Sequence, residues 1–340
     1  MRRNRRSLEG KVVVIAGASS GVGRAAALAF ARQGARVAIA ARRAEALRRV
    51  AEECRALGGK AIAVPTDVTD AQAVRRLADA AISAFGTIDV WINNAGTGAV
   101  GRFTDTPIEA HRRVVEINLI GHINGAHAVM PHFLAQDRGV LINTNSIGAW
   151  VASPLAAAYA ASKWGLRGFS ESLDAELADR PHIHVCDIFP AFLDTPGLRH
   201  GANYTGRTIK PPPPVYDPQR VADVMVDLAR RPRRAVAVGL PAQLAPLAHA
   251  LAPRLIARIA ARGMDEGLHY ATKTQVTAGN LFEPVQVGTG VHGGWDGQNR
   301  PLRIAAMAAA GIAAAVTLLA LSRSAAETLD RRSYRGHRSN

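Results

Sequence analysis

The segment 11–33 constrains the fold of this chain more than any other. A short run rich in β-branched residues, 11–16, is followed at once by the turn Gly17-Ala-Ser-Ser-Gly21-Val-Gly23 and then by the alanine-rich stretch 24–33. The first run is typical of a buried parallel strand and the last of a helix. The glycines let backbone amides approach a pyrophosphate, and the helix N-terminus adds partial positive charge. This order predicts a dinucleotide-binding unit, because a turn without a ligand needs fewer glycines and serines.

Strand-like and helix-like segments then alternate along the first two thirds of the chain. This alternation predicts a Rossmann-type, doubly wound α/β domain over 1–240, with about seven parallel strands and helices on both faces. Strands are expected at 11–16, 36–41, 61–64, 88–92, 139–145, 182–188 and 235–239.

A second group of residues carries acid–base chemistry. Tyr159 and Lys163 are four residues apart, about one helical turn, so both side chains project from one face of a helix. A nearby cation lowers a tyrosine pKa from roughly 10, and such a tyrosine can exchange a proton with a carbonyl or alcohol oxygen. Ser146 follows an apolar run that reads as a buried strand, and its hydroxyl could meet the same oxygen. A tyrosine–lysine pair alone is a weak signal, so the interpretation depends on the glycine turn upstream.

With the Gly-x3-Gly-x-Gly turn, this set resembles the short-chain dehydrogenase/reductase family over roughly residues 8–240. Asn93-Asn94-Ala95-Gly96 follows a strand-like run, where the family has its Asn-Asn-Ala-Gly signature. The resemblance implies that the catalytic residues are Ser146, Tyr159, Lys163 and Asn118, with Asn118 holding a water of the proton relay.

The resemblance also implies the cofactor contacts. Asp67 is expected to contact the adenine amino group, Thr195 the nicotinamide carboxamide, and Lys163 the nicotinamide ribose. Two positions depart from the family pattern, because Ala16 replaces a threonine and Ala191 a glycine. The expected cofactor-binding residues are Gly17, Ser19, Ser20, Gly21, Val22, Gly23, Arg42, Arg43, Asp67, Val68, Asn94, Ala95, Gly96, Tyr159, Lys163, Pro190 and Thr195.

The end of the second expected strand indicates which nicotinamide cofactor binds. It lacks the acid that would bond an adenosine ribose 2′-hydroxyl, and Arg42 and Arg43 follow instead. A guanidinium suits a 2′-phosphate by charge and by the geometry of its donors. This favours NADP(H) over NAD(H). The alternative is that both arginines simply begin a basic surface helix.

The charge of the chain bears on its partners. The formal net charge is +15, which could attract nucleic acid, anionic lipid or a phosphorylated cofactor. No nucleic-acid-binding motif accompanies it and only 5% of residues are aromatic, so no nucleic-acid partner is expected. The two cysteines and eleven histidines show no metal-ligand spacing, so no metal is expected, and the cysteines indicate a reducing compartment.

Beyond residue 240 the family pattern ends. Leucines at helical spacing with interspersed arginines predict one amphipathic basic helix over 244–264, which either packs on the core or lies in a lipid interface. Segment 272–301 reads as an extended linker, so 241–301 is interpreted as helix and linker. Segment 302–323 contains the uncharged run 304–321, which predicts a single transmembrane anchor, against a soluble alanine-rich helix or a disordered tail. Segment 324–340 is expected to be a basic disordered tail. The catalytic domain is expected in the cytoplasm, held at the cytoplasmic face of the membrane if the anchor inserts.

These observations predict an NADP(H)-dependent oxidoreductase that interconverts a carbonyl and an alcohol with Tyr159 as general acid/base. Trp150, Val151, Leu155 and Phe192 are apolar residues of the expected site. They favour a lipophilic small-molecule substrate, and the alternative is that they only pack the loops. Two other classes stay open: a catalytically silent NADP(H)-binding regulator at a membrane, and a nucleic-acid or lipid scaffold with a vestigial core. The resemblance further implies a homo-oligomer that pairs through helices over 107–136 and 154–178.

Overall fold

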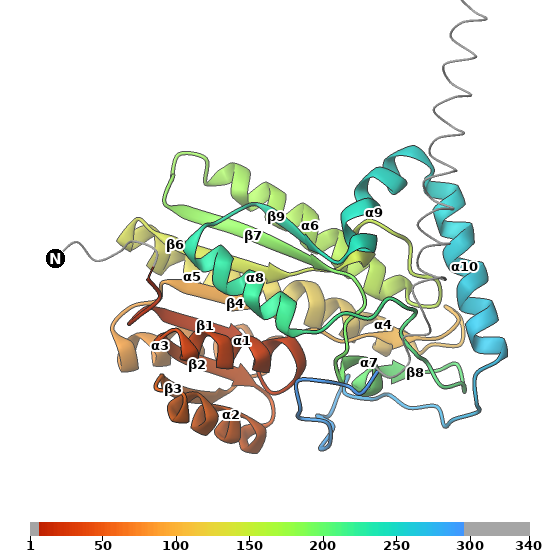
Figure 1. The fold of residues 1–340 in the computed structure, drawn as a ribbon, viewed down its shortest axis with the longest axis horizontal. Coiled ribbons are helices and arrows are strands. Elements are labelled where there is room, and N and C mark those ends of the chain that lie inside the picture. Colours follow the sequence, from red (N-terminus) through yellow and green to blue (C-terminus); the bar gives the residue numbers. More distant parts are fainter. Residues whose placement is uncertain (1–6, 296–340) are drawn as a thin grey trace, which may run out of the picture.

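The computed structural model describes residues 7–295, in which seven strands form one parallel sheet (Figure 1). From β1 to β3 each new strand is added on one side of β1, and from β4 to β9 each new strand of this sheet is added on the other side. The strand order therefore reverses between the neighbours β1 and β4. The polar carboxyl ends of the strands meet at this point, where ligands bind in open α/β sheets. Every predicted strand is confirmed. In spatial order they are β3 (Lys60–Pro65), β2 (Arg36–Ala41), β1 (Val12–Ala16), β4 (Val90–Asn93), β6 (Gly139–Thr144), β7 (Ile183–Pro190) and β9 (Ala235–Val238).

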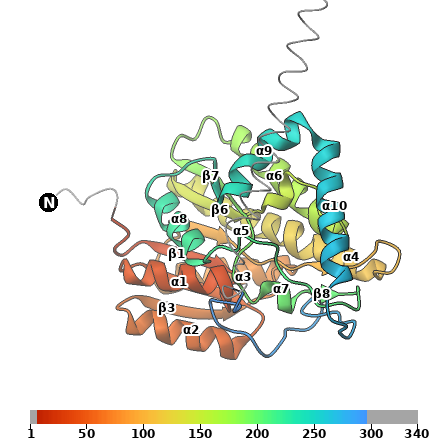
Figure 2. The ribbon, with the colours of Figure 1, turned by 45° about the vertical axis from the view of Figure 1, so that its right-hand side comes forward.

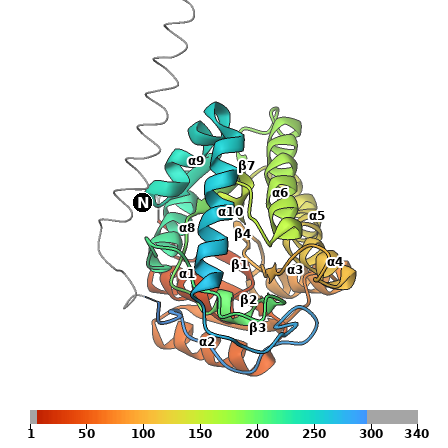
Figure 3. The ribbon, with the colours of Figure 1, turned by 90° about the vertical axis from the view of Figure 1, so that its right-hand side faces the viewer.

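Helices cover both faces of the sheet, as Figure 3 shows, so the central strand β1 is apolar along its whole length. One face carries α1 (Gly21–Arg32), α2 (Ala44–Ala56) and α8 (Gln219–Arg230). The opposite face carries α3 (Ala71–Phe85), α5 (Gly121–Gln136) and α6 (Ala157–Glu176).

Helix α3 illustrates how local sequence defines these elements. Asp70 caps its N-terminus by accepting a hydrogen bond from the backbone of Gln72, and Gly86 ends it in the left-handed conformation. Between these signals the buried residues recur at helical spacing, so one stripe faces the sheet. They are Val74, Leu77, Ala78 and Ala81.

The remaining short elements lie at the carboxyl ends of the strands, where they shape the site. They are β5 (Ala99–Val100), α4 (Ile108–Val115), the π-helical turn η1 (Glu116–Ile120), the 3₁₀ turn η2 (Ile147–Ala149), α7 (Gly197–His200) and β8 (Ala202–Asn203).

The C-terminal extension differs from the prediction of one helix over 244–264. The structure has two helices, α9 (Leu240–Leu251) and α10 (Pro253–His269), separated by Ala252. The cause is Pro253, because a proline disfavours helical geometry in the residue before it. Ala252 accordingly has φ −146° and ψ 57°. Figure 2 shows α10 at the outer side of the carboxyl-end edge, and none of its residues is fully buried.

The segment after α10 was expected to be an extended linker. It has no helix or strand up to residue 295, but it returns to the sheet and pairs with the core at two isolated bridges, Asn203 with Thr277 and Arg207 with Lys273. This segment, drawn in blue in Figures 1 and 3, runs along the carboxyl-end edge beside α1 and α2. Its packing against the core corrects the interpretation of 272–301 as a linker for the part up to residue 295.

Within residues 7–295, no helix combines the length and apolar character that crossing a bilayer requires. The predicted anchor at 302–323 and the predicted tail at 324–340 lie outside the described residues.

Candidate active site

The glycine turn joins β1 to α1 and lies against the end of β4. Gly17 has φ +93°, and a Cβ atom built on it would lie 2.5 Å from the backbone nitrogen of Ala95. A Cβ atom on Gly23 would lie only 2.0 Å from the carbonyl oxygen of Gly17. Glycine is therefore required at both positions. Ser20 precedes the helix in an extended conformation without a side-chain cap, so the first amides of α1 are left for a ligand or another acceptor. A glycine cradle at a helix N-terminus fits the pyrophosphate of a dinucleotide.

Asn94 connects the glycine turn to the neighbouring strands. Its Nδ2 donates to the carbonyl oxygen of Gly17 at 2.9 Å, and its Oδ1 accepts from the Thr144 hydroxyl at 3.2 Å. Asn93 lies one residue earlier, is buried, and donates to Asn143 at 3.0 Å. The two asparagines of the signature therefore hold β4, β6 and the turn in fixed register.

Ser146 and Tyr159 come together from different elements. Ser146 follows β6 and caps η2, where its Oγ accepts the N–H of Gly148 at 3.0 Å. Tyr159 lies in the first turn of α6. A Cβ atom built on Gly148 would lie 3.1 Å from the Tyr159 ring and 3.5 Å from the Ser146 oxygen, so both side chains lie beside Gly148. Burial raises the pKa of Tyr159, and the side chain of Ser146 opposes this increase.

Lys163 lies one turn further along α6 and is almost fully buried. Its Nζ donates to the carbonyl oxygen of Thr144 at 2.8 Å, and burial lowers its pKa to about 8, against the attraction of Asp187. Burial instead raises the pKa of Tyr159 in this structure, and the lowering of that pKa by Lys163 stays a prediction. The phenol is therefore protonated at neutral pH.

Asn118 lies in the π-helical turn η1, an irregularity that is frequent at functional sites. Its side chain is fully buried. Oδ1 accepts from the backbone nitrogen of Thr97 at 2.8 Å, and Nδ2 donates to the Thr97 oxygen at 2.9 Å and to the Ser162 hydroxyl at 3.1 Å. Asn118 thus braces the loop after β4 against α6. Its contact with a relay water stays a prediction.

Comparison with known proteins agrees with this arrangement. The family model described as short chain dehydrogenase matches residues 11–203. YxnA, an uncharacterized oxidoreductase of Bacillus subtilis, is 34% identical over 270 residues, which cover 78% of this chain and 75% of that protein. The chain belongs to the short-chain dehydrogenase family. It is accordingly an oxidoreductase that acts on a CH–OH/C=O pair with a nicotinamide cofactor.

Two solved structures resemble this short-chain dehydrogenase. A metagenomic short-chain oxidoreductase in complex with NADP is 31% identical, with a TM-score of 0.58, over 68% of this chain and 96% of that one. An alcohol dehydrogenase from Thermococcus sibiricus complexed with 5-hydroxy-NADP is 27% identical, with a TM-score of 0.58, over 68% of this chain and 95% of that one. Both alignments leave about a third of this chain uncovered.

The expected adenosine contacts of this short-chain dehydrogenase lie at the ends of β2 and β3. Arg42 and Arg43 follow β2, and Asp67 and Val68 follow β3. Asp67 accepts from the Thr69 backbone at 3.0 Å and from Nη2 of Arg113 at 2.8 Å. These bonds hold the pKa of Asp67 below its usual value although burial opposes them. Arg113 was missed from the sequence, because nothing local marks an arginine of α4 as a partner of Asp67.

The expected nicotinamide contacts follow β7. A Cβ atom built on Gly21 would lie 3.3 Å from Cβ of Thr195, so the loop after Pro190 faces the glycine turn directly. The structure therefore brings the expected residues of both ends of the cofactor to one edge of the sheet.

Asp187 was also missed as a residue of the site. It lies in β7, is 3% exposed, and accepts from the hydroxyl of Ser170 at 2.8 Å and from Nδ2 of Asn145 at 3.3 Å. Burial raises its pKa to about 7, and it faces Asn143 of β6 in the sheet. One signal could have identified it, because an aspartate inside an apolar strand is costly unless it has partners. Asp187 attracts Lys163 electrostatically, so it helps to position the lysine that lies one turn from Tyr159.

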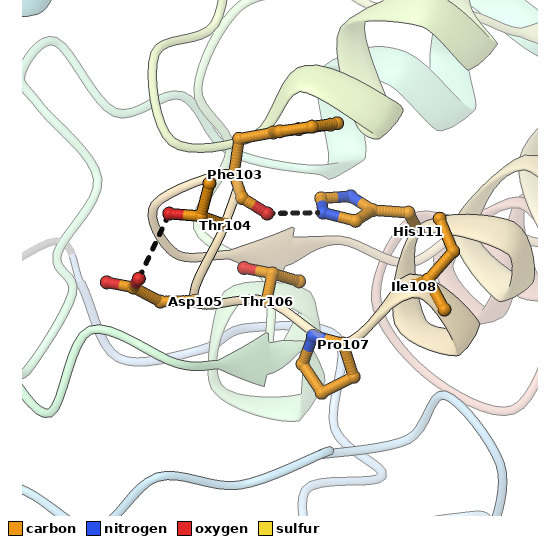
Figure 4. Close-up of a pocket in the computed structure, with 7 residues that line it drawn as sticks. All are labelled: Phe103, Thr104, Asp105, Thr106, Pro107, Ile108 and His111. Atoms are coloured by element: carbon orange, nitrogen blue, oxygen red, sulfur yellow. Dashed lines mark hydrogen bonds between the residues drawn. The ribbon is translucent and has the colours of Figure 1, made fainter.

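A surface hollow of about 470 Å³ lies apart from these residues (Figure 4). In it, a ring nitrogen of His111 lies 3.2 Å from the carbonyl oxygen of Phe103, and the two rings are 4.9 Å apart. Ser146, Tyr159 and Lys163 do not line it. The proton chemistry therefore does not take place in this hollow. Its lining residues are Phe103, Thr104, Asp105, Thr106, Pro107, Ile108 and His111.

Proposed function

We propose that this short-chain dehydrogenase uses NADP(H) to interconvert a carbonyl and a primary or secondary alcohol on a lipophilic small molecule, with Tyr159 as general acid/base. The observation that carries the proposal is that Ser146 and Tyr159, which come from different elements, both lie beside Gly148. Ser146 follows β6 at the carboxyl-end edge of the sheet, where the glycine turn also lies. Absorbance of NADPH during a screen of aldehydes and ketones tests it, and a panel without any oxidation of NADPH would contradict it.

A bound nicotinamide supplies the hydride in reduction and accepts it in oxidation. Tyr159 keeps its proton at neutral pH because burial raises its pKa, so in reduction it can donate that proton to the substrate oxygen. Ser146 accepts from the Gly148 backbone, which leaves its own O–H to donate to the same oxygen as negative charge develops there. Lys163 would hold the nicotinamide ribose, and Asn118 would hold the relay water.

The preference for NADP(H) is part of the proposal. It is supported by Arg42 and Arg43 after β2 and by the two similar structures, which are complexes with NADP and 5-hydroxy-NADP. Replacing both arginines by alanine should weaken NADPH binding by at least roughly 100-fold relative to NADH, because each of the two charge-assisted bonds contributes about 1.5–3 kcal/mol.

Fluorescence titration of both reduced cofactors measures this change in preference. The ratio of the two dissociation constants is the readout, because any general loosening of the site affects both cofactors alike. Tighter binding of NADH than of NADPH by the unaltered protein would contradict the preference.

The lipophilic substrate is supported by apolar residues in the loops after β6 and β7. Phe192 is 40% exposed beside the site, and Leu155 adopts φ +62°, a conformation that side chains rarely take unless their surroundings require it. Trp150 is less accessible to a substrate than expected, because its ring packs on Phe189 and lies under the guanidinium of Arg167. A carbonyl series of increasing chain length is expected to show rising kcat/KM, and a flat or falling series would contradict a lipophilic site.

A second candidate is a silent NADP(H)-binding regulator at a membrane. The membrane part has support on α9 and α10, where Leu247, Leu255 and Ile259 are 40–53% exposed next to Arg254 and Arg258. Apolar residues with flanking arginines suit an anionic lipid interface. Fractionation of the full-length protein against a version ending at residue 300 tests whether the segment beyond it anchors the protein. Equal recovery of both in the aqueous fraction would contradict anchoring.

Self-association is the remaining part of the proposal. Ile120, Leu134 and Trp164 are exposed apolar residues of η1, α5 and α6, on the helices for which pairing is implied. Light scattering of the full chain should give at least the mass of a dimer, and a monomer mass at micromolar concentration would contradict this.

A further inference from the structure

The C-terminal segment 279–295, here called the strap, follows the line of residues expected to bind the cofactor. It begins beside Thr97, whose hydroxyl donates to Oδ1 of Asn280 at 2.6 Å. It then passes the ends of β2 and β3 and the first turn of α1, and it reaches the loop after β7. Figure 3 shows it in blue along this edge.

At the adenosine end, carbonyl oxygens of the strap accept hydrogen bonds from the two arginines that are expected to bind a 2′-phosphate. Arg42 donates from Nη2 to the carbonyl oxygen of Asn280 at 2.5 Å and from Nη1 to that of Phe282 at 2.9 Å. Arg43 donates to the oxygen of Val285 at 2.6 Å. Glu283, the acidic residue of the strap, raises the pKa of Arg42 by its charge, although burial lowers that pKa overall. Carbonyl oxygens and one carboxylate thus supply the negative charge that these guanidiniums attract.

At the glycine turn the strap takes the donor assigned to the pyrophosphate. The backbone N–H of Gly21, at the N-terminus of α1, donates to the carbonyl oxygen of Gly290 at 2.9 Å. Arg24 of the same turn donates to the oxygen of Thr289 at 2.6 Å. An oxygen atom of the strap therefore already lies at hydrogen-bond distance from the amide that a phosphate oxygen would use, and two oxygens cannot share that position.

At the nicotinamide end the strap holds the loop after β7. The indole nitrogen of Trp295 donates to the carbonyl oxygen of Thr195 at 3.0 Å, and the backbone nitrogen of Trp295 donates to Asp194 at 2.7 Å. Arg199 covers the indole ring at 4.3 Å. Thr195 is the residue expected to contact the carboxamide.

Two residues of the strap, Gly279 and Leu281, are suited specifically to its docked position. Leu281 is fully buried in an apolar cluster with Ala99, Val114 and the ring of Tyr159. Gly279 has φ +53°, and a Cβ atom on it would lie 2.3 Å from the carbonyl oxygen of His200. A strap that merely lay on the surface would need neither a buried leucine nor so close a backbone approach.

We infer that the strap competes with the phosphates of NADP(H), so that it occupies their donors in the cofactor-free enzyme and leaves when the cofactor binds. This inference rests on the proposed function. A phosphate can displace the strap for two reasons. The neutral amide of Gly21 bonds an ionised oxygen about twice as strongly as a carbonyl oxygen, and the guanidiniums of Arg42 and Arg43 gain a full negative charge in place of neutral carbonyls. The apparent affinity for the cofactor is then reduced by the fraction of molecules in which the strap is docked. A partner that bound the undocked strap would therefore raise the apparent affinity for the cofactor.

Two measurements on the full-length protein test the inference. Hydrogen–deuterium exchange of 279–295 should become faster when NADPH is added to saturation, because the strap loses its bonds. Slower or unchanged exchange would overturn the inference, since it would mean that the strap closes over the cofactor or never meets it.

Fluorescence titration of NADPH against strap variants is the second measurement. Gly279→Ala and Leu281→Ser undock the strap by different means, and each should lower the dissociation constant by about threefold or more. Gly290→Ala is the matched control, because a Cβ atom there meets nothing closer than 3.6 Å, and it should bind NADPH as the unaltered protein does.

Unchanged or weaker binding in both undocked variants would overturn the inference while leaving the proposed function intact. Absence of NADPH binding in every form, including the unaltered protein, would instead refute the proposed function on which the inference rests.

Discussion

Tyr159→Phe is expected to reduce carbonyl reduction by about 10²–10⁴-fold and to leave NADPH binding nearly unchanged. In the proposed mechanism the phenol is the proton donor, and burial keeps it protonated at neutral pH by raising its pKa. Phenylalanine retains the ring and loses only the hydroxyl group. Steady-state absorbance of NADPH measures turnover, and fluorescence titration measures binding.

Tyr204→Phe is the matched control for this substitution. Tyr204 packs against the same apolar cluster as Tyr159, so its replacement perturbs the same region without touching Ser146. It should retain most of the turnover. Undiminished turnover in Tyr159→Phe would refute the assigned role, and an equal loss in both variants would point to packing rather than proton transfer.

Gly17→Ala should abolish cofactor binding and destabilise the fold by about 3 kcal/mol or more. Its Cβ atom would lie 2.5 Å from the Ala95 nitrogen and 2.6 Å from the Ala95 Cα, which are backbone atoms that cannot rotate away. The turn would have to move away from the end of β4 and from Asn94. Denaturant unfolding measures the stability and NADPH fluorescence the binding.

Gly58→Ala separates the close approach from the backbone conformation. Gly58 has φ +88°, similar to Gly17 at +93°, but a Cβ atom there has nothing within 4 Å. Only backbone strain of about 1 kcal/mol is expected, with normal NADPH binding. A loss of stability equal to that of Gly17→Ala would show that the approach to Ala95 is unimportant.

The prediction of the strands succeeded because it relied on short-range signals. A run such as β1 is apolar throughout because helices cover both of its faces, and turn residues mark its end. The break at Ala252 was missed because the leucine pattern continues across Pro253, although the proline itself was visible in the sequence. The role of Asp187 was missed because its partners, Ser170 and Asn145, come from other elements.

The direction of the pKa shift of Tyr159 has a similar explanation. The spacing to Lys163 correctly placed both residues on one helix, but spacing carries no information on burial. Desolvation depends on everything that packs around the hydroxyl, and here it exceeds the effects that favour the phenolate.

Short-range patterns in the amino-acid sequence define the order of the elements, the glycine turn and most of the residues at the carboxyl-end edge. These patterns depend on preferences within a few residues of the chain, and parallel strands bring their ends together without further information. The position of the strap, in contrast, depends on long-range contacts. Its bonds to Arg24, Arg42 and Arg43 join residues 238 to 265 positions apart, and such contacts leave no periodic trace in the chain. Where a segment without helix or strand lies depends on the surface against which it packs. That surface exists only after the sheet has formed.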